Sequence, residues 1–265
     1  MSTWVMLRGL GRDSRHWGAF KDAFCRSVAD STVAAVDLPG NGLLHRLASP
    51  TRIDAMTAHC RAQLQARALP PPYFVLALSL GAMVAVDWAH RYPQELGGCV
   101  LINTSLRPFN PFYRRLRLRN VPRLVRLVLG ADGALARERT ILRLTSRQHA
   151  ADGAVLEEWL ALERQCPLER GNILRQLLAA ARYRAPRQAP QPPLLMLGGG
   201  ADELVDPRCT RVIAGAWNAD FAEHPNAGHD LALDDGTWII TQVRQWQDRL
   251  AAAKDRGQVD ICRIG

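Results

Sequence analysis

Residues 73–92 read YFVLALSLGAMVAVDWAHRY, and this stretch decides the fold class. Six consecutive apolar or aromatic residues, 73–78, favour a strand that is buried on both faces. Ser79 follows, and the residues from 80 onward have the pattern of a helix that Pro93 ends. A strand that turns into a helix around a serine exposes the hydroxyl above the sheet, and the small neighbours Ala77 and Gly81 permit a tight turn.

The same alternation of strands and helices extends along most of the chain. We expect further strands at 4–7, 32–36, 99–103, 194–197 and 220–223, and further helices at 17–28, 53–68 and 237–250. This order is typical of an α/β protein with a mostly parallel sheet flanked by helices. A length of 265 residues, 48% of them hydrophobic, suits one such core.

The alternation stops between residues 106 and 190, where the pattern is helical. We expect helices at 121–129, 135–144, 155–163 and 171–183. An all-helical insertion between two strands of a parallel sheet indicates a lid over the carboxyl edge of the strands. The predicted division is therefore a first part of the core at 1–105, a helical lid at 106–190, a second part of the core at 191–250 and a poorly ordered C-terminal tail at 251–265.

Two further residues complete a catalytic hypothesis around Ser79. A serine hydroxyl needs a base, and His229 lies in a loop after the last expected strand, at the same sheet edge as Ser79. The base needs an acid to orient it, and Asp202 directly follows the strand at 194–197 and its glycines, with Asp206 as the competing acid. The S-x-G triplet alone is better explained by an ordinary turn serine. The chain order serine, acid, histidine, each after a strand, favours catalysis.

Acyl transfer also needs backbone N–H groups that stabilise the oxyanion of the transition state, and one such donor is worth about 2.7–4 kcal/mol. Leu80, at the start of the helix after Ser79, offers one N–H group. The loop after the first strand, residues 8–11, offers the other, and we expect it from Leu10. A phosphate-binding loop is disfavoured, because the glycine spacing fits neither G-x-G-x-x-G nor a P-loop with its lysine.

The chain resembles the α/β-hydrolase superfamily over about residues 4–250. The matching segments are LRGLG at 7–11, DLPGNG at 37–42, LSLG at 78–81, GGADELV at 199–205 and AGH at 227–229. Within the superfamily it looks most like small carboxylesterases, the type that includes the pimeloyl-acyl-carrier-protein methyl ester esterases. This resemblance implies ester hydrolysis through an acyl-enzyme, with no metal and no organic cofactor.

Three residues depart from the pattern of the family. Arg8 stands where histidine often precedes the glycine, Asn41 stands where a second histidine is common, and Ala77 replaces the first glycine of the serine turn. All three proposed triad residues are present. The Arg8 change leaves open what braces the oxyanion loop.

The expected lid is rich in arginine, in a chain of net charge +9. The arginines between residues 107 and 147 are numbers 107, 114, 115, 117, 119, 123, 126, 137, 139, 143 and 147, against the acids Asp132 and Glu138. A solvated face in an arginine-rich protein is the simpler interpretation. The alternative is an anionic partner beside the active-site mouth, such as an acyl carrier protein, because guanidinium groups suit phosphates and carboxylates.

The leading hypothesis is thus a serine hydrolase that cleaves carboxylic esters. A thioesterase or an acyl-carrier-protein ester hydrolase would use the same triad, and a non-catalytic binding protein on this fold is a third possibility. Nucleic acid is disfavoured as a partner because aromatic residues do not interleave with the basic ones. The six cysteines form no C-x-x-C pair, which argues against a metal site. With no expected membrane span and no secretory pattern, we expect a cytoplasmic protein.

Overall fold

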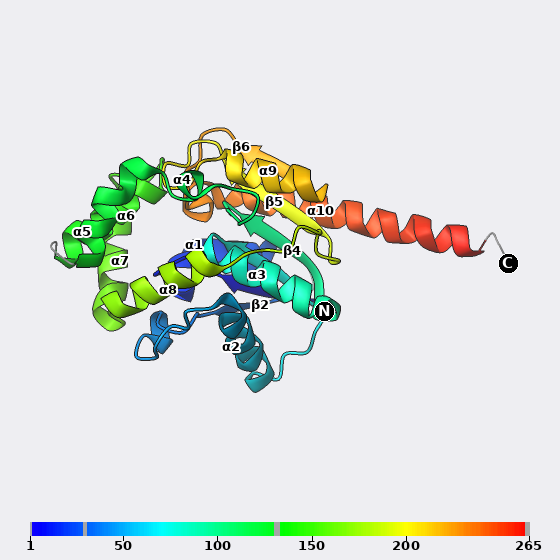
Figure 1. The fold of residues 1–265 in the computed structure, drawn as a ribbon. Coiled ribbons are helices and arrows are strands. Elements are labelled where there is room, and N and C mark those ends of the chain that lie inside the picture. Colours follow the sequence, from blue (N-terminus) through cyan, green and yellow to red (C-terminus); the bar gives the residue numbers. More distant parts are fainter. Residues whose placement is uncertain (1, 29–30, 130–132, 263–265) are drawn as a thin grey trace.

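The computed structural model describes residues 2–28, 31–129 and 133–262, so Asp132 lies outside the described part. Within it, one parallel sheet has the strand order β2-β1-β3-β4-β5-β6 (Figure 1). Its strands are β1 Ser2–Leu7, β2 Ser31–Val36, β3 Tyr73–Leu78, β4 Leu96–Ile102, β5 Leu194–Gly199 and β6 Asp220–His224. The predicted α/β fold and the position of each expected strand are confirmed.

Helices cover both faces of this sheet because successive side chains of each strand point in opposite directions. Val5 and Leu7 of β1 pack with helices α2 Ile53–Ala66, α3 Leu80–Arg91 and α9 Arg208–Trp217. Trp4 and Met6 pack on the other face with α1 Ala19–Ser27 and α10 Leu231–Cys262. Trp4 stacks on Phe74 of β3 at a centroid distance of 5.1 Å. The Phe24 ring lies 5.0 Å from Trp4 in a T-shaped arrangement. The core therefore consists of two apolar layers that hold the strand ends in place.

A helical insertion, defined as the segment from α4 to α8, connects β4 to β5 and projects to the left in Figure 1. Its helices are α4 Phe112–Arg115, α5 Val121–Leu129, α6 Ala134–Thr145, α7 Gly153–Gln165 and α8 Arg170–Arg182. The last four were expected within two residues of these bounds. The short α4 was not expected.

Two core helices differ from the expectation. The segment 208–217 contains Cys209, Thr210 and Gly215, which are weak helix formers, yet it forms α9 and buries Ile213 and Trp217. The last helix, α10, begins at Leu231, has a kink at Asp235 and continues to Cys262 instead of ending at residue 250. Three alanines at 251–253, the best helix formers, allow this continuation, and residues 263–265 lie outside the described part. No helix of the described ranges is long and apolar enough to span a bilayer.

Candidate active site

Ser79 occupies the strained turn between β3 and α3. Its backbone has φ 55° and ψ −110°, a conformation that residues other than glycine rarely adopt. The Ser79 N–H donates to the carbonyl oxygen of Ile102 at 3.0 Å, which ties the turn to the end of β4. The side chain is half-buried in an otherwise buried surrounding. Such strain persists only where the surrounding structure enforces it, and it often marks functional residues.

The two small neighbours of the turn have different roles. At Gly81, an added Cβ atom would lie 2.6 Å from the Leu7 carbonyl oxygen and 2.7 Å from that of Arg8. Helix α3 therefore starts directly against the end of β1, and only glycine fits. Ala77 is fully buried and pairs with Leu7 and Leu101 in the sheet. Its methyl group is accommodated there, which explains why the first glycine of the family pattern is dispensable.

Asp202 and His229, predicted from distant segments, are in contact. The Asp202 Oδ2 atom accepts a hydrogen bond from His229 Nδ1 at 2.7 Å, and the two side chains are 1% and 5% exposed. A carboxylate only accepts, so Nδ1 carries the proton and Nε2 is left as the proton acceptor. Oδ1 of Asp202 accepts from the Leu204 and Val205 N–H groups at 2.8 and 2.9 Å, which orients the carboxylate. The competing Asp206 instead pairs with Arg208.

The surroundings of His229 tune it as a base. Burial of the imidazole favours its neutral form, but the adjacent Asp202 carboxylate and its hydrogen bond outweigh this effect. The pKa of His229 therefore lies above the ordinary value for histidine, with Asp230 adding to the rise and Arg8 opposing it. The same contact that orients the ring thus also strengthens it as a proton acceptor.

The loop after β1 lies against Ser79, as the oxyanion hypothesis requires. An added Cβ atom at Gly9 would lie 3.3 Å from Ser79 Cβ. The Gly11 N–H donates to Gln176 Oε1 at 2.9 Å, and the Arg12 N–H to the Gly9 carbonyl at 3.3 Å. No bond of the Leu10 N–H is present among the described residues, which keeps this group available. Leu80 is the first residue of α3, and the N–H groups of a first helical turn have no acceptor within the helix.

Arg8 and Asn41, the other departures from the family pattern, brace this loop. The Arg8 guanidinium forms a two-pronged ion pair with Asp230, the residue after His229. The Asn41 side chain donates to the Arg12 carbonyl at 2.9 Å and accepts from Gln176 Nε2 at 2.7 Å. Both replacements for the usual histidines therefore connect the oxyanion loop to neighbouring segments.

Asn103 organises the site, although the sequence analysis did not single it out. It directly follows β4 with φ 47°, and it is 2% exposed. Its Nδ2 atom donates to the carbonyls of Gly228 and His229 at 3.0 and 2.8 Å, and its Oδ1 accepts from the Gly199 N–H at 2.7 Å. One amide thus joins the ends of β4 and β5 to the loop that carries His229. A polar residue directly after a buried strand was the signal that could have identified it.

The helical insertion is also attached to the histidine loop. Asp234 accepts from the Gly228 N–H at 2.6 Å and from the Arg147 N–H at 3.0 Å, and it contacts the hydroxyl of Ser146. The Asp230 N–H donates to the carbonyl of Thr145 at 2.7 Å. The turn after α6 therefore fixes the position of the segment around His229. Whether the insertion acts as a lid stays a prediction.

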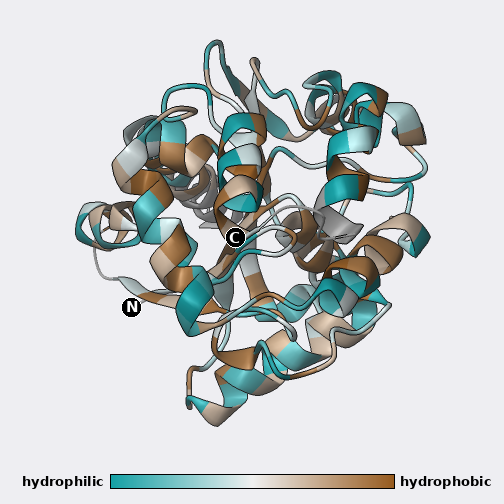
Figure 2. Ribbon diagram, turned by 90° about the vertical axis from the view of Figure 1, so that its left-hand side faces the viewer, coloured by the Kyte–Doolittle hydropathy of each residue, from teal (hydrophilic) through white to brown (hydrophobic). Residues whose placement is uncertain are grey.

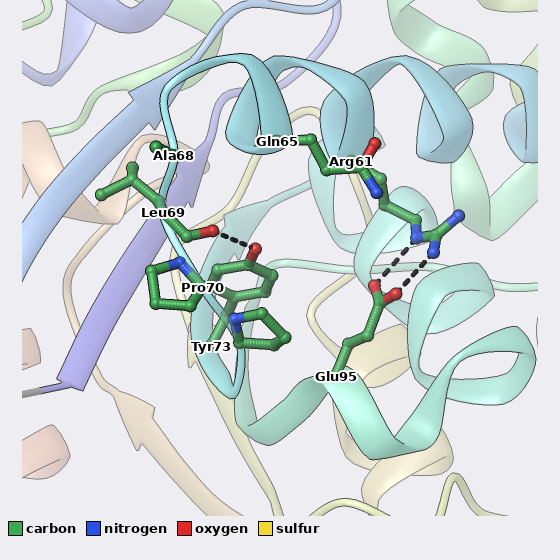
Figure 3. Close-up of a pocket in the computed structure, with 8 residues that line it drawn as sticks. Arg61, Gln65, Ala68, Leu69, Pro70, Tyr73 and Glu95 are labelled. Carbon is green, nitrogen blue, oxygen red and sulfur yellow. Dashed lines mark hydrogen bonds and ion pairs between the residues drawn. The ribbon is translucent and has the colours of Figure 1, made fainter.

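A cavity of about 370 Å³ lies away from these residues (Figure 3). Its lining includes Arg61, Tyr73 and Glu95, with Tyr73 at the start of β3 and Glu95 just before β4. Ser79 follows the other end of β3, and six strand residues span about 20 Å. The cavity therefore lies at the opposite edge of the sheet from the site. Among the described residues, no three side chains of His, Cys, Asp or Glu are grouped to hold a metal.

Some arginines in and next to the insertion form contacts within the protein, and others are exposed. Arg115 and Arg107 donate to backbone carbonyls of α8, and Arg147 pairs with Glu203 at 3.1 Å. Arg123 and Arg143 are exposed and form no ion pair among the described residues. Figure 2 shows the molecule from the side of the insertion, where hydrophilic and hydrophobic segments alternate along the helices. Some of these arginines thus serve contacts within the protein, and binding of an anionic partner by the exposed ones stays a prediction.

Of the predicted site residues, the structure brings Asp202 and His229 into direct contact. Gly9, which precedes the predicted donor Leu10, lies beside Ser79. A hydrogen bond between the Ser79 hydroxyl and His229 Nε2 is absent from the described bonds. The two residues are linked through the backbone, because Ser79 bonds to Ile102 and the next residue, Asn103, holds His229. Whether Ser79 and His229 act together therefore stays a prediction.

The chain belongs to the Alpha/beta hydrolase family, whose pattern it matches over residues 4–241. It is 36% identical over 103 residues to a pimeloyl-[acyl-carrier protein] methyl ester esterase of Chromobacterium violaceum, covering 39% of this chain and 37% of that protein. A second such esterase, from Edwardsiella ictaluri, is 28% identical over 250 residues, covering 83% and 88%. The biotin biosynthesis bifunctional protein BioHC of Teredinibacter turnerae is 33% identical over 105 residues, 39% of this chain and 17% of that protein.

The chain therefore spans well under half the length of the C. violaceum esterase and of the T. turnerae BioHC protein. Among solved structures, it is similar to a thermophilic esterase from Thermogutta terrifontis, with a TM-score of 0.74 and 20% identity over 94% of this chain and 90% of that one. The enol-lactonase of Burkholderia xenovorans gives a TM-score of 0.76 and 19% identity over 93% and 91%. These structural similarities support the fold.

Proposed function

We propose that the protein is a serine carboxylesterase with Ser79 as nucleophile, His229 as general base and Asp202 as the acid that orients it. The observation that carries the proposal is the buried hydrogen bond of 2.7 Å between His229 and Asp202, at the same sheet edge as the strained Ser79 turn. The names of the curated relatives, which include two methyl ester esterases, support ester hydrolysis.

In this mechanism the Ser79 Oγ atom attacks the ester carbonyl while His229 Nε2 accepts the hydroxyl proton. The Leu10 and Leu80 N–H groups hold the developing oxyanion, and Asp202 stabilises the imidazolium. His229 then donates its proton to the departing alcohol, which leaves an acyl group on Ser79. Water, deprotonated by the same histidine, releases the acid and regenerates the hydroxyl. These steps need no metal or organic cofactor.

Hydrolysis of p-nitrophenyl esters of graded acyl length by the wild type and by Ser79→Ala tests this proposal. Loss of a triad residue lowers kcat by roughly 10⁴–10⁶-fold, so we expect hydrolysis by the wild type and background rates for the variant. Equal rates of the two proteins would refute the mechanism. A binding protein without turnover would hydrolyse none of the esters.

A carrier-linked ester or thioester is the second candidate substrate. The relatives from C. violaceum and E. ictaluri are named for an acyl-carrier substrate. The exposed arginines Arg123, Arg139 and Arg143, which form no ion pair among the described residues, lie on α5 and α6 of the insertion. Comparing kcat/KM for one acyl group presented as a methyl ester, as a thioester and on an acyl carrier protein separates these substrates. A preference for the carrier form that Arg123→Ser and Arg139→Ser remove would support this candidate, and equal values would contradict it.

A further inference from the structure

Two residues that lie within two positions of the proposed catalytic groups are joined by a buried ion pair. Arg8 follows β1 and lies two residues before Leu10, while Asp230 is the residue after His229. Arg8 NH1 donates to Asp230 Oδ1 at 3.0 Å and NH2 donates to Oδ2 at 2.5 Å. The side chains are 3% and 4% exposed. Two parallel hydrogen bonds fix both the separation and the relative orientation of the segments they connect.

Each partner is itself held from another side. The Arg8 guanidinium lies over the ring of Trp17, 4.8 Å from its centroid, and the Asp230 N–H donates to the Thr145 carbonyl at 2.7 Å. These contacts oppose a shift of the pair with a displaced loop. It acts as a fixed spacer between the loop that carries the Leu10 N–H group and the loop that carries the imidazole.

Stability alone does not account for such a pair. Desolvation of two buried charges offsets much of their attraction, and apolar residues of similar size often stabilise a protein equally well. A fixed geometry is what the ion pair offers in addition. The reaction needs such geometry, because the oxyanion donor and the base must act on one substrate group at the same time.

We propose that Arg8 and Asp230 are positioning residues that set the distance between the Leu10 oxyanion donor and His229. This inference rests on the proposed function. Neither residue touches the substrate; they act through the two loops. Histidine, frequent in the family at the position of Arg8, could not form the same two-pronged contact.

The double variant Arg8→Met/Asp230→Leu tests the proposal, because it removes both charges and leaves no unpaired carboxylate in the interior. We expect a folded protein whose kcat for p-nitrophenyl acetate is about 100-fold lower, the effect of a displacement near 1 Å, with KM little changed. The matched control is Arg61→Met/Glu95→Leu, at the opposite sheet edge. This pair is also two-pronged, at 2.8 and 2.5 Å (Figure 3). Arg61 likewise lies over an aromatic ring, that of Tyr92. The control should keep the wild-type kcat.

A second readout is independent of turnover. The His229 Nδ1 proton, held by Asp202, should give a low-field proton resonance that shifts or disappears in the Arg8/Asp230 double variant and stays in the control. A double variant with wild-type kcat and an unchanged resonance would overturn the inference, while loss of hydrolysis in Ser79→Ala would still uphold the proposed function. If the wild type showed no Ser79-dependent hydrolysis, the proposed function would fail. The Nδ1 resonance alone would then test whether the ion pair of Arg8 and Asp230 positions His229.

Discussion

Replacing Asn103 by alanine should damage both stability and catalysis, because its side chain links three segments of the site. The substitution removes three buried hydrogen bonds, to Gly228, His229 and Gly199, at 3.0, 2.8 and 2.7 Å. At about 1 kcal/mol each, the free energy of unfolding should fall by about 3 kcal/mol. For a chain of this size that corresponds to a decrease in Tm of about 10 °C.

The catalytic effect of Asn103→Ala should exceed what the loss of stability explains. Without Asn103, the carbonyls of Gly228 and His229 lose their hydrogen bonds and the loop around His229 can move. We therefore expect kcat to fall by about 100-fold at a temperature where the variant is folded. Thermal unfolding followed by circular dichroism and p-nitrophenyl acetate kinetics measure the two effects. Asn110→Ala is the matched control, since this buried asparagine also bonds to two backbone groups, those of Leu106 and Cys209. A wild-type kcat in Asn103→Ala, or an equal loss in the control, would show that Asn103 does not position His229 for catalysis.

Two other predictions concern the base and the serine turn. Because the pKa of His229 is raised by Asp202, the acidic limb of the kcat/KM profile should lie above the ordinary value of about 6.5. Asp202→Asn should move that limb to lower pH and reduce kcat by about 10⁴-fold, so an unmoved limb would exclude His229 as the titrating group. Gly81→Ala places Cβ 2.6 Å from the Leu7 carbonyl and should lower the unfolding free energy by about 1–3 kcal/mol. Gly215 lies within α9 with open space around it, so Gly215→Ala should raise the unfolding free energy by up to about 1 kcal/mol. Differential scanning calorimetry of the two glycine variants measures both changes.

The raised pKa of His229 also links stability to pH. Its protonated form is favoured in the folded state, so this contribution is fully present below the unfolded pKa of about 6.5 and is lost as pH rises through the folded pKa. The enzyme should therefore lose this part of its stability in the same pH range in which it gains activity.

The sheet and the contact between Asp202 and His229 were predictable because both depend on short-range patterns. Apolar strands of four to seven residues can be identified individually, and the carboxyl ends of parallel strands share one edge. A residue within three positions of a strand end, such as Ser79 or Asp202, is therefore placed near this edge by the strand itself. The competing Asp206 is four residues further along, and its pairing with Arg208 removes it from the histidine.

The residues that brace the site were not predictable in the same way. The partners of Asn103 are 96 to 126 residues away in sequence, and the partner of Arg8 is 222 residues away. Which polar atom each side chain reaches depends on the path of loops whose dihedral angles no periodicity encodes. The helix α9 was missed for a different reason, because burial of Ile213 and Trp217 overrides its weak helix formers.

Fluorophosphonate labelling followed by peptide mass spectrometry tests whether His229 activates the hydroxyl of Ser79. We expect one modified serine, Ser79, in the wild type, and strongly reduced labelling in His229→Ala. Modification of another serine, or equal labelling of the wild type and His229→Ala, would contradict it.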